Sequence, residues 1–173
     1  MLNCMTATSA CVSLEEYLGT AYEHDPDYVD GELVERSLPT LLHGETFGRV
    51  HLRLAGLRYP LHLRTELRMP VKPRRYRVAD LAVFLGERPK GKYPSTPPLI
   101  VVEILSDDDR LSEALEKAED YYRWGVRHVW LADPDRRALF VFDGSGLRQV
   151  PDWALLECET SITPEQVFPD QTD

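Results

Sequence analysis

The chain has 173 residues, 43% of them hydrophobic and 28% charged, with three cysteines and no CxxC pair. This length and composition predict one compact domain and argue against a disulfide framework or a zinc site. No apolar run approaches the ~20 residues of a membrane span, and the N-terminus lacks the basic start and apolar centre of a signal peptide. We therefore expect a cytoplasmic protein that does not associate with membranes.

The net charge is −9, but the charges are unevenly distributed. The segment from Arg49 to Lys92, called the basic segment below, holds twelve Lys or Arg against three acids, whereas the remainder holds eight bases and 26 acids. A local charge of +9 is typical of a surface that faces phosphates. The other interpretation is a solvated face whose charges balance acids elsewhere in the fold.

Two helices and a hairpin are predicted in the first third of the chain. Residues 1–12 are expected to be a flexible lead, and the S-x-x-E capping box that begins at Ser13 predicts a short helix. The Asp30-Gly31 pair between apolar residues predicts a tight hairpin, with Glu32 just after its turn. From Thr40, apolar residues near helical spacing predict a second helix that carries His43 in its first turn.

The basic segment is predicted to contain two strands. Residues 59–67 alternate between apolar and polar side chains, which predicts a half-exposed strand. The prolines of 70–73 predict a break before a second strand over 76–85, whose apolar end looks buried and follows Asp80. A surface loop is expected over 86–98.

The stretch PLIVVEILSDDD from Pro98 is a continuous apolar run interrupted by Glu103, which is typical of a strand buried on both faces. A carboxylate there loses hydration and needs a cation or a hydrogen-bond donor opposite it. Glu103 therefore either lies at the strand's open end, pairs with an arginine, or belongs to a functional site.

The last third is predicted to contain a helix and further strands. The acids 107–109 favour the start of a helix, and Gly125 ends it. Residues 126–132 and 138–143 then predict a hairpin, and a last strand is expected over 153–158. Strands, one helix and strands again indicate an α/β or α+β domain with a mixed central sheet.

Asp80 and Glu103 lie in consecutive strands, so their carboxylates meet if these strands pair with the right stagger. Two such carboxylates form a site for Mg²⁺ or Mn²⁺, with positions left for water and a phosphate. On the following helix Lys117 and Tyr121 are four residues apart and share a face. Lys117 is then placed to orient a water or to stabilise charge at this site. The alternatives are a solvated Lys117 paired with Glu113 and a Tyr121 at the edge of the core.

The stretches YVDGELVE, LIVVEILS and EKAEDYYRWGVRHVWLADP, together with His43 and Asp80, resemble the Uma-type restriction endonuclease family of the PD-(D/E)XK nuclease superfamily. The resemblance covers residues 13–168, which leaves 169–173 as a C-terminal tail. It implies a single restriction-endonuclease-like domain, with a mixed central sheet flanked by helices.

The resemblance also implies site residues. Metal would be held by Asp80 and Glu103, with Glu32 as a third ligand, and His43 matches another recurrent family position. Two departures from the superfamily pattern are Ala79 in place of a proline and Leu105 in place of a lysine. The missing lysine is then expected at Lys117, with Tyr121 beside it.

Two functions follow from these residues. The first is a Mg²⁺-dependent DNA endonuclease, in which a metal-activated water hydrolyses a phosphodiester bond and a homodimer cuts both strands. The alternative, motivated by Leu105, is a non-catalytic module that binds nucleic acid or a protein. For the endonuclease, the basic segment is expected to supply phosphate contacts through six residues: Arg64, Arg68, Lys72, Arg74, Arg75 and Arg77.

Overall fold

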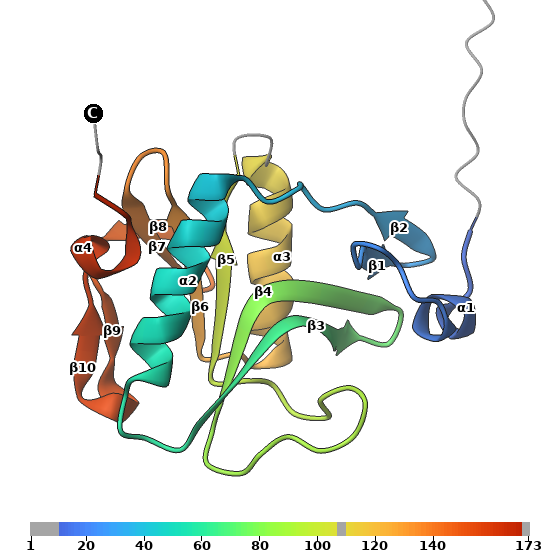
Figure 1. The fold of residues 1–173 in the computed structure, drawn as a ribbon. Coiled ribbons are helices and arrows are strands. Elements are labelled where there is room, and N and C mark those ends of the chain that lie inside the picture. The colour runs from blue at the N-terminus through green and yellow to red at the C-terminus, as the bar shows by residue number, and fades with distance from the viewer. Residues whose placement is uncertain (1–10, 107–109, 171–173) are drawn as a thin grey trace, which may run out of the picture.

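The computed structural model describes residues 11–106 and 110–170 and contains a mixed eight-stranded sheet between helices (Figure 1). The sheet order is β2-β1-β4-β5-β6-β7-β8, with β3 also paired to β4, and β5 and β6 are its parallel pair. This confirms the predicted fold class. The elements are α1 (Leu14–Gly19), β1 (Asp27–Val29), β2 (Glu32–Val34), α2 (Leu41–Ala55), β3 (Leu61–Lys72), β4 (Arg75–Leu85), β5 (Ile100–Ile104), α3 (Leu111–Trp124), β6 (His128–Asp133), β7 (Ala138–Phe142), β8 (Leu147–Val150), β9 (Trp153–Leu155), the 3₁₀ turn Leu156–Cys158, β10 (Thr160–Ile162) and α4 (Pro164–Val167).

The N-terminal elements form as their caps and turn predict. The Ser13 hydroxyl accepts a hydrogen bond from the Glu16 amide at the start of α1. Asp30 (φ 54°) and Gly31 (φ 111°) form the tight turn between β1 and β2. Residues 1–10 of the expected lead lie outside the described residues. Val12 belongs to the fold, because its amide donates to the Gly31 carbonyl.

The break predicted at 70–73 is wrong in part, because β3 continues through Pro70 to Lys72. Pro70 lies opposite Tyr76 of β4, and the register shifts between Pro70 and Lys72. Among the described residues β3 pairs with β4 alone, so its other edge is open. A proline on such an edge removes no ladder hydrogen bond, which explains why the strand tolerates it.

The C-terminal third follows its predictions except near its end. Gly125 ends α3 in the left-handed conformation, and β6 and β7 form the predicted hairpin. The acids expected to cap α3 at 107–109 lie outside the described residues. The strand predicted over 153–158 ends at Leu155, because a 3₁₀ turn and a left-handed Glu159 (φ 47°) reverse the chain into β10. Strands β8 and β10 and helix α4 were not predicted from the sequence.

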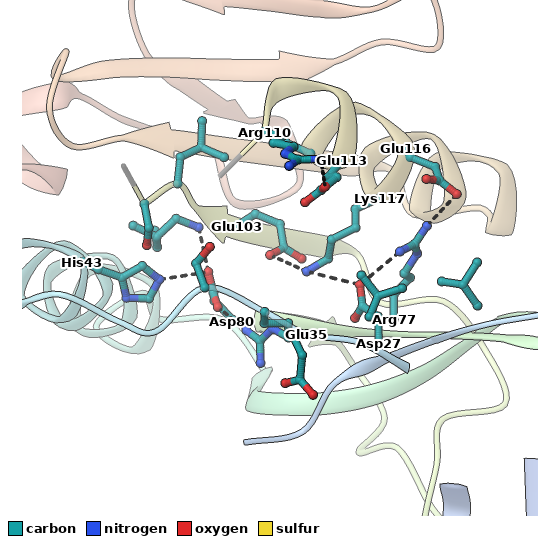
Figure 2. Close-up of a pocket in the computed structure, with 18 of the residues that line it drawn as sticks. Asp27, Glu35, His43, Arg77, Asp80, Glu103, Arg110, Glu113, Glu116 and Lys117 are labelled. Carbon is teal, nitrogen blue, oxygen red and sulfur yellow. Dashed lines mark hydrogen bonds and ion pairs between the residues drawn. The ribbon is translucent and has the colours of Figure 1, made fainter. Parts of the chain in front are cut away.

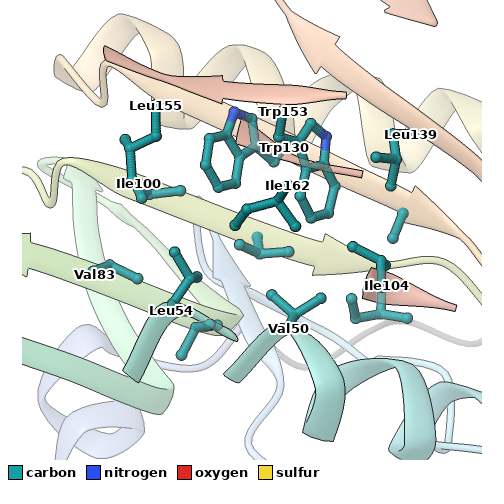
Figure 3. Packing of buried hydrophobic residues seen from close by; sticks show 14 of the residues in the cluster. Val50, Leu54, Val83, Ile100, Ile104, Trp130, Leu139, Trp153, Leu155 and Ile162 are labelled. Carbon is teal, nitrogen blue, oxygen red and sulfur yellow. The ribbon is translucent and has the colours of Figure 1, made fainter. Parts of the chain in front are cut away.

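The sheet is covered on both faces by apolar clusters. One cluster joins α2 (Val50, Leu54) to β9, β10 and alternate residues of β4 and β5, and Trp130 stacks on Trp153 within it (Figure 3). The other cluster joins α3 (Ala118) to the opposite side of the same strands. Because β4 and β5 are buried on both faces, a charged residue on them needs a partner inside the fold.

No helix of the described residues is long and apolar enough to cross a membrane.

Candidate active site

The candidate site lies where β4 changes its neighbour. On one edge, strand β4 pairs with β1 at Tyr76 and with β5 from Leu81. Between these two positions no strand of the described residues lies beside that edge, and side chains of other elements bond to the β4 backbone instead. The Asp27 carboxylate accepts from the Val78 amide at 2.7 Å, and the Lys117 ammonium donates to the Val78 carbonyl at 3.0 Å. These polar side chains thus complete the hydrogen bonding of β4 and point into the same gap.

A pocket of about 350 Å³ opens at this gap (Figure 2). Its walls come from β1, β2, α2, β4, β5 and α3, so residues between Asp27 and Lys117 are brought together there. Asp80 and Glu103 both line it, as does Lys117 from α3. The strands predicted to bring the two acids together are indeed neighbours, with Leu81 opposite Val102.

Asp80 is buried and is held by three groups. Its Oδ2 accepts from the Ile104 amide at 2.7 Å and lies 3.4 Å from His43 Nε2, and its Oδ1 lies 2.6 Å from the Arg36 guanidinium. Burial alone would raise the pKa of Asp80, but the hydrogen bond with His43 and the charge of Arg36 outweigh it and hold that pKa below its usual value. Asp80 is therefore ionised near neutral pH.

Glu103 is also buried, but its pKa shifts in the opposite direction. Its Oε1 accepts from the Tyr121 hydroxyl at 2.8 Å, and its Oε2 lies 3.0 Å from Lys117 Nζ. Burial, aided by repulsion from Asp80, raises the pKa of Glu103 to about 7 although Lys117 opposes the shift. Two neighbouring carboxylates with divergent pKa values are typical of a functional site.

Lys117 and Tyr121 share the face of α3 that meets Glu103, as their spacing predicts. The Lys117 side chain is 14% exposed and does not form the alternative pair with Glu113. Burial alone would lower the pKa of Lys117, but attraction to Asp27 and Glu103 raises it, so the amine is charged. The position expected of Lys117 is confirmed, whereas its part in a reaction stays a prediction.

Glu32 and His43 also line the pocket. His43 follows the N-cap Thr40 at the start of α2 and contacts Asp80 there. Glu32 is exposed on β2. Within residues 11–106 and 110–170 no three His, Cys, Asp or Glu side chains are grouped closely enough to hold a metal. The geometry therefore gives Glu32 no support as a third ligand, and that assignment stays a prediction.

Sequence reasoning missed two residues of the site, Arg36 and Asp27. Arg36 bridges Asp80 and Glu66, and Asp27 binds Arg77 and the Val78 amide. Both flank the YVDGELVE stretch, but no local pattern marks them as site residues. Their partners lie about 30 to 50 residues further along the chain.

A family model described as "putative restriction endonuclease", named Uma2, matches residues 14–172. The chain belongs to the Uma2 family. The crystal structure of a putative nuclease of DUF820 from Anabaena variabilis is 20% identical, with a TM-score of 0.74 over 91% of this chain and 97% of that one. This likeness confirms the fold. The curated proteins searched contain no match.

The site contains the oxygen ligands that a hard divalent cation prefers. Mg²⁺ and Mn²⁺ are commonly held by one or two carboxylates, with water and substrate phosphate completing the coordination. Asp80 and Glu103 supply two carboxylates in one pocket, and each oxygen of Glu103 accepts a single hydrogen bond from the described residues, so it keeps acceptor capacity. The Asp80 carboxylate binds the Arg36 guanidinium, so it faces a position that a cation can occupy. The residues present thus fit a divalent ion.

The six basic residues expected to contact phosphates are mostly engaged within the protein. Arg77 lines the pocket, and the other five do not. Arg68 is bound by Asp25 and by two backbone carbonyls, Lys72 by Asp120, and Arg75 by Asp30 and Asp120. Arg74 and Arg64 donate to the carbonyls of Asp30 and Leu63. Their contact with DNA stays a prediction.

Proposed function

We propose that this Uma2-family protein is a Mg²⁺- or Mn²⁺-dependent DNA endonuclease that hydrolyses phosphodiester bonds. The observation that carries the proposal is the convergence of Asp80, Glu103 and Lys117 on one pocket. Two acids can hold the divalent ion that assists phosphodiester hydrolysis, and a lysine can stabilise the charge that develops on the phosphate. Family membership supports this reaction class.

Each residue has a distinct part in the proposed reaction. Asp80 and Glu103 would hold the divalent ion, which supplies Lewis acidity and activates water when bound. The Lys117 ammonium, fixed between Glu103 and the Val78 carbonyl, would orient the attacking water and stabilise charge that develops on the phosphate. Tyr121 holds the Glu103 carboxylate in place through its hydroxyl.

Residue 105 is a leucine, so a lysine near Glu103 has to come from another element. In the superfamily pattern this position carries the lysine, but here Leu105 packs against the apolar cluster beneath α3. The Lys117 ammonium lies beside the carboxylate that precedes that position, so the missing charge is restored from a helix. This placement favours the endonuclease over a non-catalytic module.

The test combines a Mn²⁺ titration with cleavage of supercoiled plasmid. We expect Asp80→Asn and Glu103→Gln to lose both Mn²⁺ binding and cleavage. Lys117→Met should bind Mn²⁺ at least as tightly as the wild type, because it removes a positive charge beside Glu103, but cleave about 10²- to 10³-fold more slowly, the usual loss for one group that stabilises a transition state. Glu119→Gln, on the outer face of α3, is the control and should leave both unchanged.

Two outcomes would contradict the proposal. Absence of Mn²⁺ binding in the wild type would remove the metal site, and full cleavage by Lys117→Met would remove the part given to that residue. Mn²⁺ binding without cleavage of any plasmid, linear duplex or single strand would favour the binding module. A homodimer belongs to the proposal, because cutting both strands of a duplex uses two sites, and light scattering tests it.

A further inference from the structure

Among the described residues, Arg36 is the cation closest to Asp80. It follows β2, lines the pocket, and its side chain is 18% exposed. One guanidinium nitrogen lies 2.6 Å from Asp80 Oδ1, and the other binds Glu66. Burial alone would lower the pKa of Arg36, but the charges of Asp80 and Glu103 raise it, so the guanidinium stays charged.

The second partner of Arg36 has an unusual backbone. The pairs Thr65 with Leu81 and Leu67 with Ala79 place Glu66 of β3 opposite Asp80 of β4. Two carboxylates in such positions repel each other unless a cation lies between them. Glu66 also has a φ of 50°, which is costly for a residue with a side chain and needs surrounding contacts to hold it. Arg36 supplies such a contact by bridging both acids.

Both oxygens of the Asp80 carboxylate are therefore engaged by protein groups in this state. Its Oδ2 is taken by the Ile104 amide and faces His43, and its Oδ1 is taken by Arg36. A divalent ion coordinated by Asp80 would lie within a few ångströms of the guanidinium, where like charges repel strongly in a buried site. The two cations compete for the same carboxylate.

We propose that Arg36 is a resident counter-cation of the site, which holds the Asp80 carboxylate when no divalent ion is bound and leaves it when the ion binds. The proposal rests on the proposed metal site and adds a residue that sets its affinity. Glu66, 58% exposed, is the second carboxylate that can keep the released guanidinium near the pocket.

The test is a titration of the purified full-length chain with Mn²⁺ alone, followed by calorimetry or electron paramagnetic resonance. We expect Arg36→Gln to bind Mn²⁺ about tenfold or more tightly than the wild type, since a neighbouring charge changes the proton affinity of a carboxylate by one to three powers of ten. Arg36→Lys, which keeps the charge, should stay close to the wild type. Arg123→Gln, an equal loss of charge on the outer surface of α3, is the control.

The outcomes separate this inference from the proposed function. Equal or weaker Mn²⁺ binding by Arg36→Gln, with normal binding by the wild type, would overturn the competition and leave the metal site intact. Absence of binding in both proteins would overturn the metal site and the inference together. Circular dichroism checks folding, and Arg36→Met, with an apolar stem of similar shape, replaces Arg36→Gln if that variant does not fold.

Discussion

Asp120 of α3 joins the basic segment to the body of the protein. Its side chain is 2% exposed and accepts from Lys72 at 2.5 Å, from Arg77 Nε at 2.8 Å and from Arg75 at 3.2 Å. The three cations come from the end of β3 and the start of β4. Replacing this carboxylate tests whether the basic segment is held by internal ion pairs.

We expect Asp120→Asn to lower the free energy of unfolding by about 3 kcal/mol, the lower end of the cost of breaking a buried ion pair. The lower end applies because Lys72 is 38% exposed and Arg75 keeps Asp30 and Glu116 as partners. With a urea dependence of about 2 kcal/mol per molar for a domain of this size, the midpoint of unfolding should fall by about 1.5 M.

The effect should also depend on pH with a defined sign. Burial alone would raise the pKa of Asp120, but hydrogen bonds from Lys72 and Arg77 outweigh it and lower that pKa below its usual value of 3.8. A carboxyl group whose pKa is depressed in the folded state stabilises the protein at pH values above its unfolded-state pKa. This stabilisation is lost as the pH falls through the folded-state pKa. The difference between wild type and Asp120→Asn should therefore be full at pH 7 and shrink below about pH 4.

Urea unfolding followed by tryptophan fluorescence measures both effects. Glu119→Gln is the matched control, because Glu119 is the preceding residue and pairs with Arg123 on the exposed face of α3. An exposed pair of this kind contributes only about 0.3–0.5 kcal/mol. If Asp120→Asn cost no more than this control, the ion pairs of the basic segment would not stabilise the fold, and its side chains would be available to phosphates.

Two further predictions concern charge. Burial would raise the pKa of Glu157, but hydrogen bonds from Arg127 and His128 lower it to about 2. In the same urea assay, Glu157→Gln should therefore lower the free energy of unfolding by about 1 kcal/mol at pH 6, after allowance for solvent screening. The loss should be smaller at pH 2, where the carboxyl is partly protonated. For the proposed DNA contacts, the affinity of Glu103→Gln for duplex DNA, measured by fluorescence anisotropy, should fall steeply between 50 and 200 mM salt. A salt-independent affinity would mean that the basic segment does not contact phosphates.

Local patterns predicted the parts of the site that are close in sequence. The spacing of Lys117 and Tyr121 is a property of one helix, so their common direction follows from the sequence alone. The apolar run around Glu103 indicates a strand buried on both faces, in which a carboxylate away from the open end needs a partner. That this partner would be Lys117 could be proposed because α3 directly follows β5. Its ammonium does reach Glu103.

The rest depended on contacts between distant segments. The charge count of the basic segment could not show that Arg68 and Arg77 are bound by Asp25, Asp27 and Asp120, which lie 43 to 50 residues away. Ion pairing across a sheet is set by register and by strand order, and neither follows from composition. Pro70 was misinterpreted for the same reason, because only the open edge of β3 makes it acceptable.

The position of the site follows from the way in which β4 changes partners. A buried strand edge without a neighbour needs side-chain donors and acceptors for its backbone groups. Asp27 and Lys117 meet this need at Val78, and the Asp80 carboxylate does the same for the Ile104 amide of β5. Groups that satisfy a backbone are fixed in place, which gives the site its preorganisation. The lysine proposed to act on the phosphate therefore also donates a structural hydrogen bond to β4. Lys117→Met should lower the free energy of unfolding, measured by urea denaturation, as well as the rate of cleavage.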